Sequence, residues 1–263
     1  MSSNVNSVQN VIKVALGLCV ICSIMISSAA VLLKPRQTAN QLLDRNKNVL
    51  IAAGMFNPDV DTNADVEARF SEFNARMVDL QEGRFLTEEE MQSLGVDPQS
   101  YDQQSAKNDP EMSINLTGDQ DVASIRRRAN YATVYTLTND SGEIESIVLP
   151  VNGYGLWGIM YGFLALESDG STVRGIGFYD HQETPGLGGE ISNPDWQAQW
   201  VGKEVYGDNG NVNFRVVKGG GSGDNEIDAL SGATLTSRGV ENMVQFWLGE
   251  NGFGPFLENE IQG

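Results

Sequence analysis

Asp228-Ala229-Leu230-Ser231-Gly232-Ala233-Thr234-Leu235-Thr236-Ser237 lies between a glycine-rich loop, Gly219–Gly223, and a predicted helix. The helix is predicted from an apolar stripe spaced i, i+3, i+4, i+7 and i+8, which consists of Val240, Met243, Val244, Trp247 and Leu248. Thr236 or Ser237 is the expected N-cap. Thr234 therefore lies just ahead of a helix N-terminus, where free backbone N–H groups and the helix dipole favour an anionic group.

The same stretch follows the pattern Asp, two residues, Ser or Thr, Gly, Ala, Thr. This pattern resembles the flavinylation motif of the family that comprises the C subunit of the Na⁺-translocating NADH:quinone reductase and the G subunit of the Rnf complex. In that family the last Thr carries FMN through a phosphoester bond, so the resemblance implies covalent FMN on Thr234. It also implies that neighbouring residues belong to the cofactor site, namely Asp228, Ser231, Gly232, Ala233, Leu235 and Thr236.

Two roles within this motif stay open. Asp228 is expected to be recognised by the flavin transferase that modifies the chain, or to help bind the metal of that enzyme. Thr236 carries a second hydroxyl close to Thr234, and the motif alone does not say whether it shares in the modification.

A second informative stretch is Glu183-Thr184-Pro185-Gly186-Leu187-Gly188. Proline and glycine at these positions predict an irregular loop whose N–H groups suit a planar ring or its carbonyl oxygens. The stretch matches an E-T-P-G-L-G loop that lies against the isoalloxazine in the resembled family. The resemblance implies cofactor contacts from Glu183, Thr184, Gly186, Leu187 and Gly188.

Two further segments are assigned to the cofactor site. Gly155-Leu156-Trp157-Gly158 resembles a family segment that lines the flavin, which implies roles for Leu156, Trp157 and Gly158. Lys218 is a candidate partner for the flavin phosphate or ring. The equally weighted alternative is that its side chain only faces solvent. No catalytic residue and no metal ligand are predicted.

Residues 153–158 also satisfy the pattern G-x-G-x-x-G, with Asp180 in the position of a ribose-binding acid. However, the segment that follows, Ile159–Leu166, has no helical stripe and ends in a turn. Strand, turn and strand form a meander rather than a βαβ unit, so a dinucleotide-binding Rossmann site is not expected.

The composition narrows the class of protein. The chain has 263 residues and a formal net charge of −18, which argues against binding to nucleic acid or to anionic lipid head groups. Its two cysteines, Cys19 and Cys22, both fall in an apolar run, where small packing residues are the expected role.

A membrane span is predicted near the N-terminus. Residues 1–12 form a polar tail, and the uncharged run Val14–Leu33 is long enough, at about 30 Å, to cross a bilayer. We predict an uncleaved transmembrane helix over residues 13–34, with a cleaved signal peptide as the alternative. The excess of Lys and Arg after the span favours a cytoplasmic soluble part. The resemblance implies the opposite, a single-pass protein of the bacterial inner membrane with its soluble domain in the periplasm, and we adopt that orientation.

The central part of the chain is expected to be helical and then extended. A helix is predicted over residues 37–53 and ends at Gly54. A second helix is predicted from the apolar residues Val66, Phe70, Phe73, Met77 and Leu80, and a third runs from Thr87, with Glu90 completing a capping box, to Ser93. Residues 96–122 are expected to form a linker, and Arg126–Arg128 a solvated basic face or partner contact.

From Tyr131 the apolar period changes to two, which predicts strands. The expected strands are Tyr131–Leu137, Glu143–Leu149, Ile159–Leu166, Thr172–Tyr179 and Val205–Val217, with Trp196 and Trp200 on a short core helix. The fold class is therefore α+β: a tail (1–12), a transmembrane helix (13–34), a helical segment and linker (35–122), and an antiparallel-sheet FMN-binding domain with packed helices (123–263).

The resemblance implies a flavoprotein subunit that relays electrons from NADH toward ubiquinone in a sodium-exporting membrane complex. Such a subunit is inactive alone, and its partners are the other subunits and, during maturation, the transferase. Two alternatives stay open. One is an anchored extracytoplasmic ligand-binding module without a redox role. The other is a hydrolase using Ser231 or Thr234 with His181 as base, although G-x-S-x-G is missing.

Overall fold

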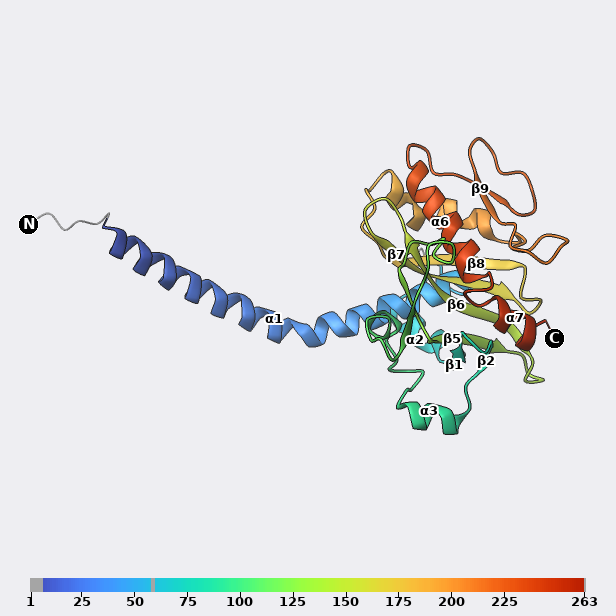
Figure 1. Cartoon of the computed structure of the whole chain (residues 1–263), viewed down its shortest axis with the longest axis horizontal. Helices are drawn as coiled ribbons and strands as arrows, with labels where there is room; N and C mark the ends of the chain where they lie inside the picture. The colour runs from blue at the N-terminus through green and yellow to red at the C-terminus, as the bar shows by residue number, and fades with distance from the viewer. Residues whose placement is uncertain (1–6, 58–59, 263) are drawn as a thin grey trace, which may run out of the picture. The chain divides into compact units, whose positions relative to one another are not determined.

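The computed structural model describes residues 7–57 and 60–262. The chain divides into two compact units, Met1–Asp44 and Arg45–Gly263. Figure 1 shows the order of the elements along the chain. The expected α+β class is confirmed, because a long apolar N-terminal helix precedes a sheet-rich domain with packed helices.

The N-terminal helix α1 runs from Val8 to Ala52 without interruption. Among the described residues it is the one helix long and apolar enough to cross a membrane, with a mean hydropathy of 2.5 over its most apolar window. The helices expected over 13–34 and 37–53 are therefore one element. Pro35 lies inside it, where the missing N–H removes one intrahelical hydrogen bond without ending the helix.

The last turns of α1 belong to the C-terminal unit and pack against strand β8 (Val173–Asp180). A Cβ atom at Gly175 would lie 2.5 Å from the Ala52 carbonyl oxygen. At Gly177 it would lie 2.8 Å from the Asn48 carbonyl oxygen. Both glycines are therefore required by the close approach of helix and strand. As expected, the helix ends next to Gly54, which has a positive φ of 68°.

One antiparallel sheet forms the centre of this unit, with the strand order β2-β1-β5-β6-β7-β8. The predicted meander is confirmed, since successive strands pair as neighbours. The strands are β1 (Asn74–Asp79), β2 (Arg84–Phe85), β5 (Tyr131–Thr138), β6 (Ile144–Tyr154), β7 (Ile159–Glu167) and β8. The G-x-G-x-x-G pattern lies at the turn between β6 and β7, which excludes a βαβ unit there.

The second predicted helix is wrong beyond Phe70. Helix α2 spans only Asn63–Phe70, and β1 follows and pairs with β5, so that Met77 lies opposite Thr133. The apolar residues of this segment, Phe70, Phe73 and Met77, are spaced as on a helix. Its backbone N–H and C=O groups form hydrogen bonds with the edge of β5 instead of with one another.

Residues 96–122 are not a linker. They contain helix α4 (Gln103–Ala106) and strand β3 (Ser113–Asn115), which pairs with β4 (Arg127–Ala129). The buried Tyr101 donates a hydrogen bond from its hydroxyl to the Tyr131 carbonyl oxygen at 3.1 Å. The structure therefore joins this segment to the sheet in one compact unit, whereas the sequence suggested a boundary at residue 122.

The basic triplet Arg126–Arg128 does not face solvent along its whole length. Arg128 is buried, and its Nη1 donates to the carbonyl oxygens of Leu80 and Asn251. Arg128 thus ties the end of β1 to the turn before helix α7 (Gly254–Glu260).

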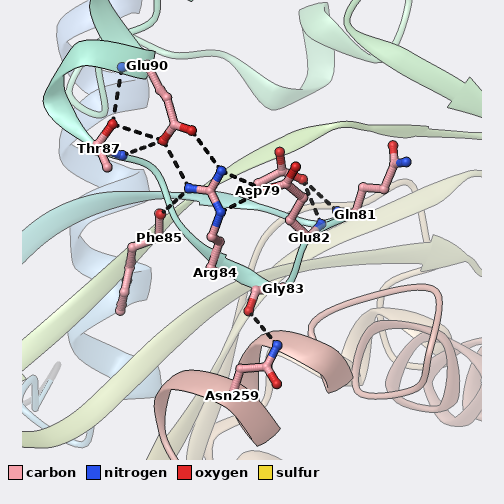
Figure 2. A network of polar contacts seen from close by, with 9 residues as sticks. All are labelled: Asp79, Gln81, Glu82, Gly83, Arg84, Phe85, Thr87, Glu90 and Asn259. Carbon is pink, nitrogen blue, oxygen red and sulfur yellow. Dashed lines mark hydrogen bonds and ion pairs between the residues drawn. The ribbon is translucent and has the colours of Figure 1, made fainter.

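Helix α3 (Glu88–Leu94) begins at Thr87, and its predicted capping box is confirmed (Figure 2). The Thr87 N–H donates to Glu90 Oε2 at 2.9 Å, and Arg84 contacts the same carboxylate at 2.7 Å. Hydrogen bonds from Arg84 and then Thr87 lower the pKa of Glu90 to about 2. Asn259 on α7 donates to the Gly83 carbonyl oxygen and links α7 to the β1–β2 turn.

Helix α6 (Thr234–Trp247) covers β6, on the face opposite the end of α1. Its predicted apolar stripe is buried as expected, and a Cβ at Gly153 would lie 2.8 Å from Met243 Cβ. Trp196 and Trp200 are buried on α5 (Pro194–Gln197) and the short 3-10 helix η2 (Ala198–Trp200), which confirms their core role. A second 3-10 helix, η1 (Gly188–Ser192), precedes them.

The strand predicted over Val205–Val217 is mostly wrong. Only β9 (Arg215–Val217) is a strand, and it pairs in parallel with β10 (Glu226–Asp228). The segment before it turns at Gly207–Gly210, where Gly210 has a positive φ of 74°. The glycine-rich loop connects β9 to β10, and Ala233 and Thr234 follow shortly after.

Candidate functional site

The three stretches singled out from the sequence meet at one buried carboxylate, that of Glu183. Glu183 Oε1 accepts hydrogen bonds from the backbone N–H groups of Leu156 at 2.9 Å and Trp157 at 3.0 Å. Glu183 Oε2 accepts from the hydroxyl of Thr236. Because Glu183 is only 5% exposed, its carboxylate faces protein rather than a ligand at the surface. The loop, the β6–β7 turn and α6 are thereby joined.

Two glycines leave the space that this carboxylate occupies. A Cβ at Gly155 would lie 2.5 Å from Glu183 Oε1. A Cβ at Gly188 would lie 2.5 Å from Thr236 Oγ1 and 2.6 Å from Glu183 Oε2. Neither position accepts a side chain without moving the carboxylate. Gly186 differs, since its surroundings are open and its positive φ of 75° is what requires glycine.

Thr234 is the first residue of α6, with Ala233 as N-cap, and it is exposed. The N-cap expected at Thr236 or Ser237 is Ala233 instead, three or four residues earlier, and both hydroxyls are engaged inside the protein. Thr236 donates to Glu183, and Ser237 Oγ accepts from the Leu230 N–H at 3.0 Å. The first N–H groups of a helix have no intrahelical acceptor, so Thr234 stands where an anionic group is favoured.

The stretches that meet near this helix start carry exposed apolar side chains. Trp157 is 60% exposed and Leu235 is 54% exposed, and Leu156 and Leu187 are also exposed. Leu187 Cδ2 lies 3.1 Å from the Cβ position of Gly232, which brings the loop against the stretch before α6. Exposed apolar groups from separate segments mark an interaction site more often than single exposed residues do.

The loop and the turn are held in defined conformations. Thr184 O accepts from the N–H groups of Leu187 at 3.1 Å and Gly189 at 2.9 Å. Trp157 Nε1 donates to Thr184 Oγ1 at 3.1 Å, so the loop is also tied to the turn. Gly158 O accepts from the Gly155 N–H at 2.8 Å and closes that turn.

Lys218 and Asp228 stand on either side of the glycine-rich loop. Asp228 Oδ1 accepts from the Gly221 N–H at 2.7 Å, and its own N–H donates to Gln199 Oε1. Asp228 therefore holds the glycine-rich loop, a role that the motif did not indicate. Lys218 is exposed just after β9 and faces solvent.

His181 is engaged away from the exposed hydroxyls. Its Nε2 lies 3.0 Å from Ser192 Oγ, and its Nδ1 accepts from the Glu183 N–H at 3.3 Å. This geometry does not support His181 as a base for Ser231 or Thr234. Within the part of the chain that the structure describes, no cluster of three or more His, Cys, Asp or Glu residues could hold a metal ion.

Sequence reasoning missed Gly239, which lies on α6 where the helix touches the β6–β7 turn. A Cβ there would come within 3.0 Å of the Tyr154 carbonyl oxygen and 3.1 Å of Gly155 Cα. A glycine in the middle of an otherwise regular helical stripe was the available signal.

The residues present fit a flavin mononucleotide. An exposed hydroxyl at a helix N-terminus suits a phosphate, and the exposed Leu156, Trp157 and Leu187 suit an apolar ring. The sequence pattern of the FMN-binding domain family matches residues 155–249, a range that contains all three stretches.

Relatives match over nearly the whole chain. The C subunit of the Na(+)-translocating NADH-quinone reductase of Yersinia pestis is 45% identical over 99% of this chain and 96% of its own length. That of Vibrio alginolyticus is 46% identical over 100% of this chain and 99% of its own.

Solved structures show the same fold. The crystal structure of Shewanella oneidensis NqrC is similar with a TM-score of 0.72 and 33% identity, covering 81% of this chain and 94% of that one. The corresponding protein of Parabacteroides distasonis gives a TM-score of 0.64 at 25% identity, covering 87% of this chain and 98% of that one. The chain therefore belongs to the family of the C subunit of the Na(+)-translocating NADH-quinone reductase, as the resemblance of its motifs implied, and carries an FMN-binding domain.

Proposed function

We propose that this chain is the membrane-anchored flavoprotein subunit of a Na⁺-translocating NADH:quinone reductase, and that Thr234 carries FMN as a phosphothreonyl ester. The observation that supports this best is the convergence of three stretches on Glu183, around an exposed hydroxyl at the start of α6. In this role the chain relays electrons within the complex and has no activity alone.

The choice of Thr234 rests on which hydroxyls of the motif are accessible. Thr236 is fully buried and Ser237 is nearly so, and each already makes a hydrogen bond. Ser231 is exposed, but it precedes the helix, whereas Thr234 is its first residue. A phosphate on Thr234 is close to the free N–H groups and the positive end of the helix dipole.

The side chains around Thr234 bind and orient the ring. Leu156, Trp157 and Leu187 offer apolar contact, and the backbone of the Thr184–Gly189 loop is held rigid by its own hydrogen bonds. When bound, FMN supplies the one-electron and two-electron redox chemistry, while the protein supplies orientation and partial exclusion of water. Because the site lies at the surface, a covalent bond retains the cofactor at any dilution.

Helix α1 anchors the subunit in the inner membrane, and the other subunits of the complex and a flavin transferase are its partners. We place the FMN-binding domain in the periplasm. The Lys and Arg residues that follow the span favour the opposite side. Protease added to intact spheroplasts decides the matter, because a periplasmic domain is digested and a cytoplasmic one is protected.

Attachment is tested on the full chain produced with a flavin transferase. The denatured protein is expected to fluoresce as a flavin after gel separation, and its intact mass is expected to rise by one FMN minus water. Thr234→Ala removes both signals while the fold stays native, because Thr234 is exposed. Ser141→Ala, which removes an exposed hydroxyl outside the motif, is the matched control and keeps both. Flavin retained by Thr234→Ala contradicts the assignment, and a colourless native protein favours a binding module without redox function.

A further inference from the structure

We propose that Glu183 is a positioning residue, whose buried carboxylate holds the Gly155–Trp157 turn and the first turn of α6 together before any flavin is attached. This inference rests on the proposed function, since it concerns how that flavin site is assembled. It differs from the family resemblance, which implied a direct contact between Glu183 and the ring.

The buried Glu183 carboxylate is satisfied by neutral hydrogen-bond donors. None of the ion pairs among the described residues involves Glu183. A buried carboxylate without hydrogen-bond donors is strongly unfavourable. Leu156 N–H, Trp157 N–H and the Thr236 hydroxyl provide the donors, two on one oxygen and one on the other. Hydrogen bonds to an ionised acceptor are among the stronger ones in proteins.

Two glycines pack directly against the Glu183 carboxylate. Gly155 and Gly188 come from two different stretches, and a Cβ at either position would lie within 2.6 Å of a Glu183 carboxylate oxygen. The backbone on both sides is therefore in contact with the carboxylate. The absence of a side chain at both positions is therefore what lets the turn and the loop approach this carboxylate.

The hydrogen bonds of Glu183 reach residues of the proposed flavin site. The two amides that Glu183 binds belong to Leu156 and Trp157, whose side chains are exposed beside α6. Thr236 lies two residues after Thr234 on the same helix. By holding these groups, Glu183 sets the position of the apolar side chains relative to the Thr234 hydroxyl.

Amide hydrogen exchange tests this on the flavin-free full chain in detergent, produced without the transferase. In the unaltered protein the Leu156 and Trp157 amides are expected to be protected. In Glu183→Ala they are expected to exchange at least about tenfold faster, because they lose their acceptor. Glu183→Gln keeps an oxygen of the same size and position, so most of the protection is expected to return.

Glu190→Ala is the matched control, because Glu190 also lies in this region but bonds to Asn193 at 2.7 Å. It is expected to leave the Leu156 and Trp157 amides unchanged. The proposal is overturned if these amides exchange equally fast in Glu183→Ala and the unaltered protein, or if Glu183→Gln gives no rescue.

A second variant covers the case in which Glu183→Ala does not fold. Thr236→Val keeps the volume of the side chain and removes one donor to Glu183. Faster exchange of the Ser237 amide, which bonds to Ala233 O at 3.0 Å, is expected. Unchanged exchange at Ser237 overturns the proposal. Because no flavin is present in either assay, these results are independent of whether Thr234 proves to be the attachment residue.

Discussion

Gly239→Ala is expected to destabilise the protein, although alanine is the better helix former. Gly239 faces the β6–β7 turn from α6. An added Cβ would come within 3.0 Å of the Tyr154 carbonyl oxygen and within 3.2 Å of Met160 Cε. Met160 is flexible, but the Tyr154 carbonyl belongs to the end of β6, which is paired with β7, so helix and sheet must move apart.

Two opposed effects set the size of the change in the free energy of unfolding. In an exposed helix, replacing glycine by alanine contributes about 1 kcal/mol of stability. Overpacking a well-packed interior costs about 1–3 kcal/mol. A backbone carbonyl yields less readily than a side chain, so the upper part of that range applies. The free energy of unfolding is expected to fall by about 1–2 kcal/mol.

The assay is urea denaturation of the full chain in detergent, followed by tryptophan fluorescence. Trp196, Trp200 and Trp247 are buried and report on the fold. The midpoint is expected to fall while the slope with urea stays constant. Arg238→Ala, at the exposed neighbouring position, is the control and is expected to change stability by less than about 0.5 kcal/mol. A Gly239→Ala protein as stable as the unaltered one would refute the packing argument.

Two other predictions concern the loop and the alkaline stability of the domain. Leu187→Asp is expected to alter the absorption and fluorescence of the flavin, because Leu187 is exposed beside Gly232. Attachment is expected to continue, because Thr234 remains accessible. An unchanged spectrum would show that this loop does not contact the flavin. Burial raises the pKa of Tyr179 to about 12 from 10.0. The unfolded chain therefore releases this proton first, and the contribution of Tyr179 to the free energy of unfolding is expected to fall between about pH 10 and pH 12, by about 1 kcal/mol per pH unit. Tyr179→Phe is expected to flatten that decline in urea titrations at several pH values, and an identical decline contradicts the assignment.

Local signals predicted a large part of the fold. The apolar run in α1, the capping box at Thr87 and the buried stripe of α6 each depend on residues close together in the chain, and all three are confirmed. The meander of β5 to β8 is also confirmed, because alternation and short turns specify both the strands and their neighbours.

The errors lie where a distant partner decides the conformation. Residues 74–79 have helical apolar spacing, yet they form β1 because the edge of β5, more than fifty residues later, accepts their backbone hydrogen bonds. Residues 96–122 have the composition of a linker, yet Tyr101 and β3 pack on the domain. Local composition does not report such long-range pairing.

From the sequence came the resemblance of three short motifs to a known family and the position of Thr234 close to a helix N-terminus, because motif residues and helical spacing are local properties. Only the tertiary structure decided that Glu183 is buried and that Thr236 is engaged while Thr234 is exposed. Glu183 is separated from Trp157 by 26 residues and from Thr236 by 53. Burial and hydrogen bonding between such distant residues arise only when the sheet and α6 pack together, and no pattern within one stretch encodes them.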